Sequence, residues 1–348
     1  MVNKFFKTAV LSFAAIATLA SCGGNNQSAQ EQLPSKKERI QQLLSQAGSG
    51  DYVPAAFFKH FPHKFGPEAV QEHIDFIRAT GNDVAKVQFE VIFPAVEIQK
   101  PEDLANVPVY EADFFEEQLA VIEGVSKQLG DSLLILPTVY GPTIMLYETL
   151  GKNTIELIKA NPELGEKAID NVTASLENFL RAARQRGADG FYVSSILGVT
   201  EEGEIDYDFF NNYIRKYDKR LSETAHQLSD INVLHICGFT HNNFDYAQYA
   251  DYPGEIINIP SRHADGSLID LKALQKVFQR PIFGGLDNRG VIVNGSIDEI
   301  KAEIDKVFAV APASFVLGAD CTVPADQDLS KLRAAIDYAH GWRAAHAK

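Results

Sequence analysis

The sequence lacks the features that mark several large classes of protein. Lys and Arg number 32 against 46 Asp and Glu, which gives a formal net charge of −14. This balance argues against nucleic-acid binding, because that function requires a basic surface. The chain has no internal repeat of fixed period, and low-complexity sequence is confined to residues 22–48. The apolar run at residues 9–20 is too short to span a bilayer.

The N-terminus has the pattern of an export signal. Lys4 and Lys7 precede the apolar run, and residues 19–23 read Leu-Ala-Ser-Cys-Gly. This segment resembles the bacterial lipobox, in which the cysteine is lipidated and becomes the mature N-terminus; the alternative is an ordinary cleaved signal. We therefore expect a signal peptide at residues 1–21 and lipidation of Cys22. The expected location is the bacterial cell envelope, anchored to a membrane by lipid and facing the periplasm or the exterior.

The rest of the sequence predicts one large α/β domain. Residues 22–48 have the composition of a flexible tether, so the domain is expected at residues 49–348. There, short apolar runs alternate with longer amphipathic stretches, as in βα units. Eight such units predict a TIM (βα)₈ barrel. The eight candidate strands are residues 53–58, 84–90, 133–139, 190–196, 232–237, 256–259, 281–286 and 314–317, and the main candidate helices are residues 36–47, 67–80, 111–129, 162–186, 208–228, 271–279, 297–308 and 329–346.

Cysteine is scarce, and this makes each cysteine informative. The chain has 3 cysteines; lipidation accounts for Cys22 and leaves Cys237 and Cys321. In an exported protein such a pair suggests a disulfide. However, His235 lies two residues before Cys237, and on a strand these two side chains share a face. One histidine and two cysteines suit Zn²⁺ with a fourth position open, so the sequence favours a shared metal over a disulfide.

The barrel prediction places these residues where the active sites of such barrels lie, at the C-terminal ends of the strands. The candidate ligands end the fifth strand or follow the eighth strand. Glu90 ends the second strand, and Asp287 and Arg289 follow the seventh. Polar and metal-binding side chains are therefore expected to gather at one end of the barrel.

Two segments resemble the uroporphyrinogen decarboxylase superfamily. Residues 284–287, Gly-Gly-Leu-Asp, look like its Gly-Asn-Leu-Asp segment, and residues 141–143 with Tyr147 look like its Gly-x-Pro-x-Thr…Tyr segment. The resemblance covers about residues 50–345 and implies a TIM barrel with a deep C-terminal cleft. Residues 58–64 depart from the pattern, because they are basic but lack the paired arginines that hold the carboxylates of a porphyrinogen.

The departures match a sister group, the corrinoid-dependent methyltransferases that methylate a small thiol such as coenzyme M. That group carries His-x-Cys…Cys as zinc ligands, and His235, Cys237 and Cys321 match the pattern. The resemblance implies Zn²⁺ as cofactor, a thiolate that attacks a methyl group, a corrinoid or corrinoid protein as methyl donor, and a small thiol or methylated compound as substrate. Decarboxylation of a tetrapyrrole and non-catalytic binding of a tetrapyrrole or corrinoid are the alternatives.

The supporting residues of such a site have less specific signals. Each candidate also has an ordinary structural explanation: a solvated carboxylate, an ion pair at the barrel rim, a surface histidine or a core tyrosine. The candidates are Glu90, Tyr147 and Asp287 for catalysis and His60, His63 and Arg289 for substrate binding; His241, His263 and Asp320 are near the site in sequence terms only.

Overall fold

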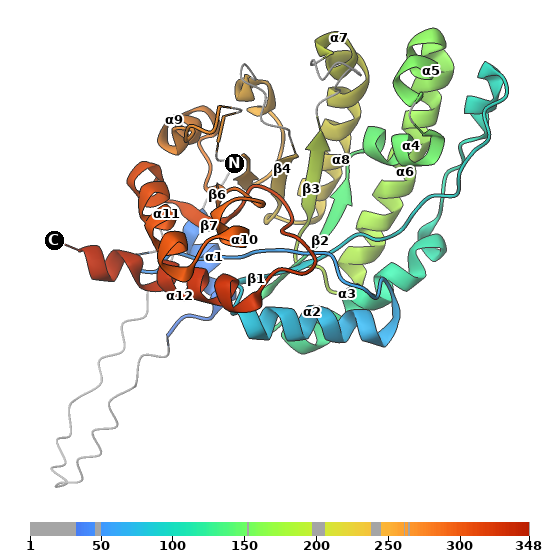
Figure 1. The fold of residues 1–348 in the computed structure, drawn as a ribbon. Coiled ribbons are helices and arrows are strands. Elements are labelled where there is room, and N and C mark those ends of the chain that lie inside the picture. The colour runs from blue at the N-terminus through green and yellow to red at the C-terminus, as the bar shows by residue number, and fades with distance from the viewer. Residues whose placement is uncertain are drawn as a thin grey trace, which may run out of the picture. The chain divides into compact units, whose positions relative to one another are not determined.

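Parallel strands, taken in chain order, form the sheet at the centre of the fold (Figure 1). The structure is a computed structural model that describes residues 33–45, 50–151, 153–196, 206–237, 245–260, 262–263 and 265–347. The predicted signal peptide, Cys22 and His241 lie outside the described residues. Pro34–Lys348 form one compact unit. Within the described residues, the strands are β1 (Val84–Val87), β2 (Leu134–Tyr140), β3 (Tyr192–Ile196), β4 (Val233–Cys237), β5 (Ile256–Asn258), β6 (Ile282–Leu286) and β7 (Phe315–Ala319).

Residues 53–58 occupy the position between β7 and β1 and so close the barrel. Ala55 forms a parallel bridge with Leu317 of β7. On the other side, the backbone N–H of Ala55 donates to Asp83 Oδ2 (2.7 Å) and that of Phe57 donates to Asn82 Oδ1 (2.9 Å). The predicted first strand is therefore a single bridge instead of a full ladder, because next to β1 it has these side-chain partners and one backbone bond, from Asp83 N–H to Ala55 O (3.0 Å).

Helices surround the strands, and their apolar faces pack against the outside of the barrel (Figure 1). The predicted helix 208–228 is divided by a π-helical turn, and the predicted helix 111–129 begins with a 3₁₀ turn. The elements are α1 (Lys36–Leu44), α2 (Gly66–Thr80), α3 (Glu116–Leu129), α4 (Pro142–Leu150), α5 (Thr154–Ala160), α6 (Pro162–Gln185), α7 (Tyr207–Phe209), α8 (Arg215–Leu228), α9 (Leu271–Phe278), α10 (Val291–Asn294), α11 (Ile297–Val310) and α12 (Leu329–His346), with 3₁₀ segments η1 (Pro101–Asn106), η2 (Ala112–Phe115) and η4 (Tyr246–Tyr249) and the π turn η3 (Phe210–Ile214).

The barrel interior is a separate apolar cluster that α1 closes at the end where the strands begin. Ile40 and Leu43 of α1 are fully buried in this cluster. Alternate strand residues point inward, and the cluster contains Val84 of β1, Leu134 of β2 and Val233 of β4. Side chains two and four positions after Val233 therefore also face the interior, at the opposite end. This fold confirms the predicted TIM barrel.

A helix that spans a membrane must be both long and apolar, and the described helices differ from this pattern. None of them is long and apolar enough to cross a bilayer.

Candidate metal centre

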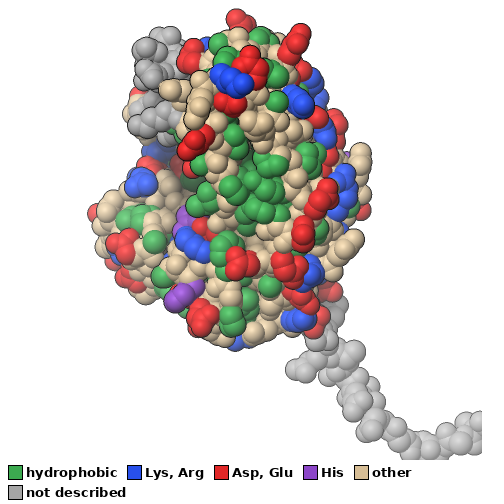
Figure 2. All heavy atoms as spheres, turned by 90° about the vertical axis from the view of Figure 1, so that its right-hand side faces the viewer, with side chains coloured by type: hydrophobic (Ala, Val, Ile, Leu, Met, Phe, Trp, Pro, Cys, Tyr) green, Lys and Arg blue, Asp and Glu red, His purple; other side chains and the backbone are tan. Residues whose placement is uncertain are grey.

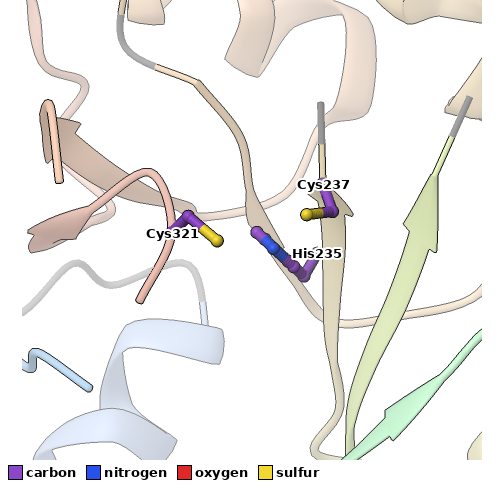
Figure 3. Close-up of side chains that lie close together, drawn as sticks. All are labelled: His235, Cys237 and Cys321. Carbon is purple, nitrogen blue, oxygen red and sulfur yellow. The ribbon is translucent and has the colours of Figure 1, made fainter. Parts of the chain in front are cut away.

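Three side chains converge at the C-terminal end of the barrel. His235 and Cys237 come from β4, where they occupy alternate positions and project from the same face. Cys321 lies two residues beyond Ala319, the last residue of β7. The ligand atoms of these three residues all lie within 4.8 Å of one another. Figure 3 shows the imidazole and the two sulfur atoms directed toward one another.

The orientation of the His235 ring is set by Asn258 of the neighbouring strand β5, which faces it in the parallel register. Asn258 is fully buried, and its Nδ2 donates to the backbone oxygens of Phe283 (3.1 Å) and Ala319 (3.2 Å). Its Oδ1 must therefore accept, so Nδ1 of His235 donates the hydrogen bond that joins the two side chains. This leaves Nε2 of His235 as the ring nitrogen that would bind a metal.

The two cysteines are free thiols and form no disulfide. Contact between them makes one proton easy to lose and the other difficult: the hydrogen bond from Cys237 lowers the pKa of Cys321, and the same contact raises the pKa of Cys237. A thiolate buried in this way favours a cation beside it. An imidazole and two sulfur atoms within reach of one another form a donor set that fits Zn²⁺, with three protein ligands and one open position.

A cavity of about 390 Å³ borders all three side chains. It contains two of the predicted substrate-binding residues, His60 and Arg289. The remaining lining comes from residues 53–58, from β1, β2 and β3, and from the segments after β6 and β7. The lining residues are Phe58, His60, Lys86, Thr138, Tyr140, Tyr192, Ser194, His235, Cys237, Asn288, Arg289, Cys321, Thr322, Val323, Pro324 and Ala325.

Glu90 contacts basic side chains of the first loop. Its Oε1 is 2.8 Å from His60 Nδ1, and its Oε2 is 2.9 Å from Lys64 Nζ. Burial opposes ionisation of Glu90, but the hydrogen bonds from His60 and Lys64 outweigh it and lower its pKa. Glu90 does not line the cavity directly; it holds His60, which does. Its predicted catalytic role stays a prediction.

The structure places the other three candidates away from the cavity lining. His63 Nδ1 pairs with Glu72 at 2.8 Å, and Glu72 raises the pKa of this exposed imidazole. Tyr147 is on α4 with 41% of its surface exposed. Asp287 accepts a hydrogen bond from the backbone N–H of Arg289 (2.8 Å), so the contact between these two residues is a local turn. Their predicted roles remain untested.

Of the residues that are near the site in sequence terms, neither His263 nor Asp320 lines the cavity, but Asp320 contacts a residue that does. The backbone N–H of His263 donates to Ser267 O (2.9 Å). Asp320 accepts from the backbone N–H of Asn288 (2.8 Å), and burial raises its pKa to about 6. Asn288 itself lines the cavity and donates to Thr322 O (2.7 Å).

Sequence reasoning missed Lys86, which lines the cavity, and Asn258, which holds the His235 ring. Lys86 lies two residues after the inward-facing Val84 and therefore points into the barrel. Asn258 is in the same strand register as His235. The available signal was the same in both cases: a single polar side chain inside a short apolar strand, at an inward-facing position.

Comparison with known proteins gives results for family and for fold. Residues 77–342 match the family described as Uroporphyrinogen decarboxylase (URO-D). Methylcobamide:CoM methyltransferase MtbA of Methanosarcina acetivorans is 25% identical over 194 residues, which is 55% of this chain and 54% of that protein. MtbA of Methanosarcina mazei is 23% identical over 251 residues, which is 71% and 70% of the two chains. The match thus spans about half the length of the first of these relatives.

Solved structures show the same fold. A methyltransferase from Methanosarcina mazei superimposes with a TM-score of 0.69 at 16% identity, covering 89% of this chain and 99% of that chain. A B12-independent methionine synthase from Shewanella sp. W3-18-1 gives 0.56 at 12% identity, covering 85% and 98%. Because the family match extends over most of the barrel, from α2 to α12, the chain belongs to the uroporphyrinogen decarboxylase family.

Proposed function

We propose that this chain is a zinc-dependent methyltransferase that transfers a methyl group, carried by a corrinoid, to the sulfur of a small thiol. The proposal rests on the ligand atoms of His235, Cys237 and Cys321, which lie within 4.8 Å of one another at the border of a cavity. Two relatives named Methylcobamide:CoM methyltransferase support the same chemistry. Alone, the low identity of these relatives would support only a general likeness.

The contribution of each residue follows from the contacts around it. Asn258 fixes His235 as the Nδ1–H tautomer, so that Nε2 is available to a metal. Cys237 and Cys321 supply two anionic sulfur ligands once both protons have been lost. A zinc ion held by these three residues would keep a substrate thiol deprotonated at neutral pH.

The reaction then needs one nucleophilic displacement. The thiolate sulfur of the substrate forms the new S–CH₃ bond as the bond between the methyl group and its carrier breaks. The electron pair of that bond leaves with the carrier, and the thiol proton has already been released to solvent. No general base is required in the cavity, which is consistent with the absence of Asp and Glu from the lining residues that the structure describes.

Decarboxylation of a porphyrinogen has weaker support. Such a substrate carries many carboxylates, which are gripped best by the planar fork of arginine. Among the lining residues of the cavity, one is an arginine, Arg289. The cavity volume of about 390 Å³ also favours a small molecule over a whole tetrapyrrole.

The direct experiment is a methyl-transfer assay on the purified protein loaded with one equivalent of Zn²⁺. Methylcobalamin is the donor, and 2-mercaptoethanol, 3-mercaptopropionate and 2-mercaptoethanesulfonate are the acceptors. We expect loss of methylcobalamin and formation of the methyl thioether, abolished in His235→Ala and Cys321→Ser. Cys22→Ala is the matched cysteine control and should retain activity. Zinc-loaded protein that methylates none of these thiols would contradict the proposal.

A further inference from the structure

Lys86 has an unusual environment for a lysine. Its side chain lies inside the barrel, and only 7% of its surface is exposed. Its Nζ lies 5.1 Å from the ring centre of Phe58 and 4.8 Å from that of Tyr192, so the ammonium group is stabilised by two aromatic faces. Its one hydrogen-bond acceptor among the described residues is Gln88 Oε1, at 2.6 Å. No described carboxylate pairs with it, although buried charges are usually paired.

A second polar group of the same wall lacks a partner. Thr138 lies on β2, next to β1, and is 2% exposed. Its Oγ1 is buried with no hydrogen-bond partner among the described residues. Lys86 and Thr138 both line the cavity that the metal ligands border. A buried hydroxyl without a hydrogen-bond partner is unfavourable. Its presence beside a cavity therefore points to a ligand that forms a hydrogen bond with it.

Basic side chains line part of the cavity, although the chain as a whole is acidic. The chain carries 46 acidic against 32 basic residues, and Figure 2 shows Asp and Glu side chains spread over one face of the molecule. Among the described residues, the cavity lining nevertheless includes no Asp or Glu and includes Lys86, Arg289 and His60. A small anion beside Lys86 would therefore meet basic side chains and no carboxylate of the described lining.

From these observations we propose that Lys86 and Thr138 form an anion-binding subsite within the cavity, and that Lys86 selects substrates carrying a carboxylate or a sulfonate. The Lys86 ammonium group donates a charge-assisted hydrogen bond to the anion, and the Thr138 hydroxyl donates a second. That the anionic group belongs to a thiol rests on the proposed function; that the subsite binds an anion does not.

The charge state of Lys86 suits this role. Burial lowers the pKa of Lys86 to about 8, so most of the protein carries the cation at pH 7. The neighbouring Cys321, Cys237 and Glu90 act against burial and favour the cation; an anion bound beside Lys86 would add a direct partner for its ammonium group.

The first test measures binding without zinc and without catalysis. Ethanesulfonate, propionate, the neutral analogue propionamide and the cation propylammonium are titrated into the zinc-free protein by calorimetry. We expect the anions to bind at millimolar concentrations and the neutral and cationic analogues to bind at least tenfold more weakly. Comparison of ethanesulfonate with propionate identifies which anion the subsite prefers.

Variants locate the binding. Lys86→Met should weaken anion binding about tenfold to a hundredfold, Thr138→Val by a smaller factor, and Lys86→Arg should retain part of it. Lys272→Met is the control, because Lys272 lies on the outer helix α9 and donates to Ala309 O. Circular dichroism checks that each variant folds; if Lys86→Met does not fold, Lys86→Gln takes its place.

A kinetic readout separates this inference from the proposed function. In zinc-loaded protein, Lys86→Met should raise KM for 3-mercaptopropionate or 2-mercaptoethanesulfonate and leave KM for 2-mercaptoethanol unchanged. Equal binding of anionic and neutral analogues by the wild-type protein, or equal anion binding by wild type and Lys86→Met, would overturn the subsite. Neither result would bear on whether the protein transfers methyl groups. Conversely, absence of methyl transfer by a protein that binds anions would reject only the proposed function.

Discussion

At the scale of single residues, Asn258 decides what His235 can do. The spacing of His235 and Cys237 was predictable, because alternate residues of a strand share a face. The contact with Asn258 was not, since it depends on the register between β4 and β5, which the sequence does not state. The same holds for Glu90, whose partners His60 and Lys64 come from a loop about 30 residues earlier in the chain.

Removal of the Asn258 amide should weaken metal binding. In Asn258→Ala the His235 ring loses the acceptor that fixes its tautomer, so zinc affinity should fall about 10- to 100-fold. Competition with a chromophoric chelator measures the affinity. Asn171→Ala is the control, because Asn171 donates to Val107 O on the outside of the barrel. Equal zinc affinity in wild type and Asn258→Ala would show that the amide has no role in ligand orientation.

Asp218 gives the stability of the protein a defined pH dependence. It is 2% exposed; Ser195 Oγ donates to its Oδ2, and its Oδ1 has no partner among the described residues. Burial raises its pKa from 3.8 to about 7. Between pH 3.8 and about 7, Asp218 is deprotonated in the unfolded chain but protonated in the folded chain. The contribution of Asp218 to the free energy of unfolding therefore falls as the pH rises to about 7 and is constant above it.

Asp218→Asn should abolish this loss, because the amide does not ionise. Relative to wild type, the free energy of unfolding of the variant should rise by on the order of 4 kcal/mol between pH 4 and pH 8. Urea unfolding at pH 4, 6 and 8 measures the difference, with the exposed Asp131→Asn as control for the change to an amide. A difference between wild type and Asp218→Asn that does not vary with pH would show that Asp218 ionises normally in the folded state.

At the scale of elements, strand and helix periodicity predicted most elements, but it did not predict where α1 packs. The predicted helix 36–47 is present as Lys36–Leu44, with a capping box between Ser35 and Glu38. Nothing local in the sequence indicates that Ile40 and Leu43 enter the barrel end, since their partners come from several separate strands. The π turn within the predicted helix 208–228 likewise reflects packing that periodicity does not reveal.

Truncation of α1 side chains should destabilise the barrel without affecting the metal site. Leu43 is fully buried, so Leu43→Ala should lower the free energy of unfolding by about 2–5 kcal/mol. The neighbouring Gln41 is exposed, and Gln41→Ala should change it by less than about 0.5 kcal/mol. Urea unfolding measures both variants. If Leu43→Ala were as stable as Gln41→Ala, α1 would not close the barrel in solution.

At the scale of the whole molecule, the sequence predicts attachment to a membrane through Cys22, which lies outside the described residues. If Cys22 carries lipid, the protein should sediment with the membrane fraction and require detergent for release. Cys22→Ala should move to the soluble fraction, because the variant lacks the thiol that the lipid would modify. Cys22→Ala protein that still sediments with membranes would reject lipidation as the means of attachment.

The proposed function depends most on the metal, and the zinc content of the purified protein tests it directly. We predict about one equivalent of Zn²⁺ per chain, held by His235, Cys237 and Cys321 and lost in Cys237→Ser and Cys321→Ser, because three protein ligands leave one position for substrate. Protein purified without metal, unable to bind added Zn²⁺ and with no titratable thiol in its folded domain, would mean that Cys237 and Cys321 form a disulfide. The proposed methyl transfer would then be wrong.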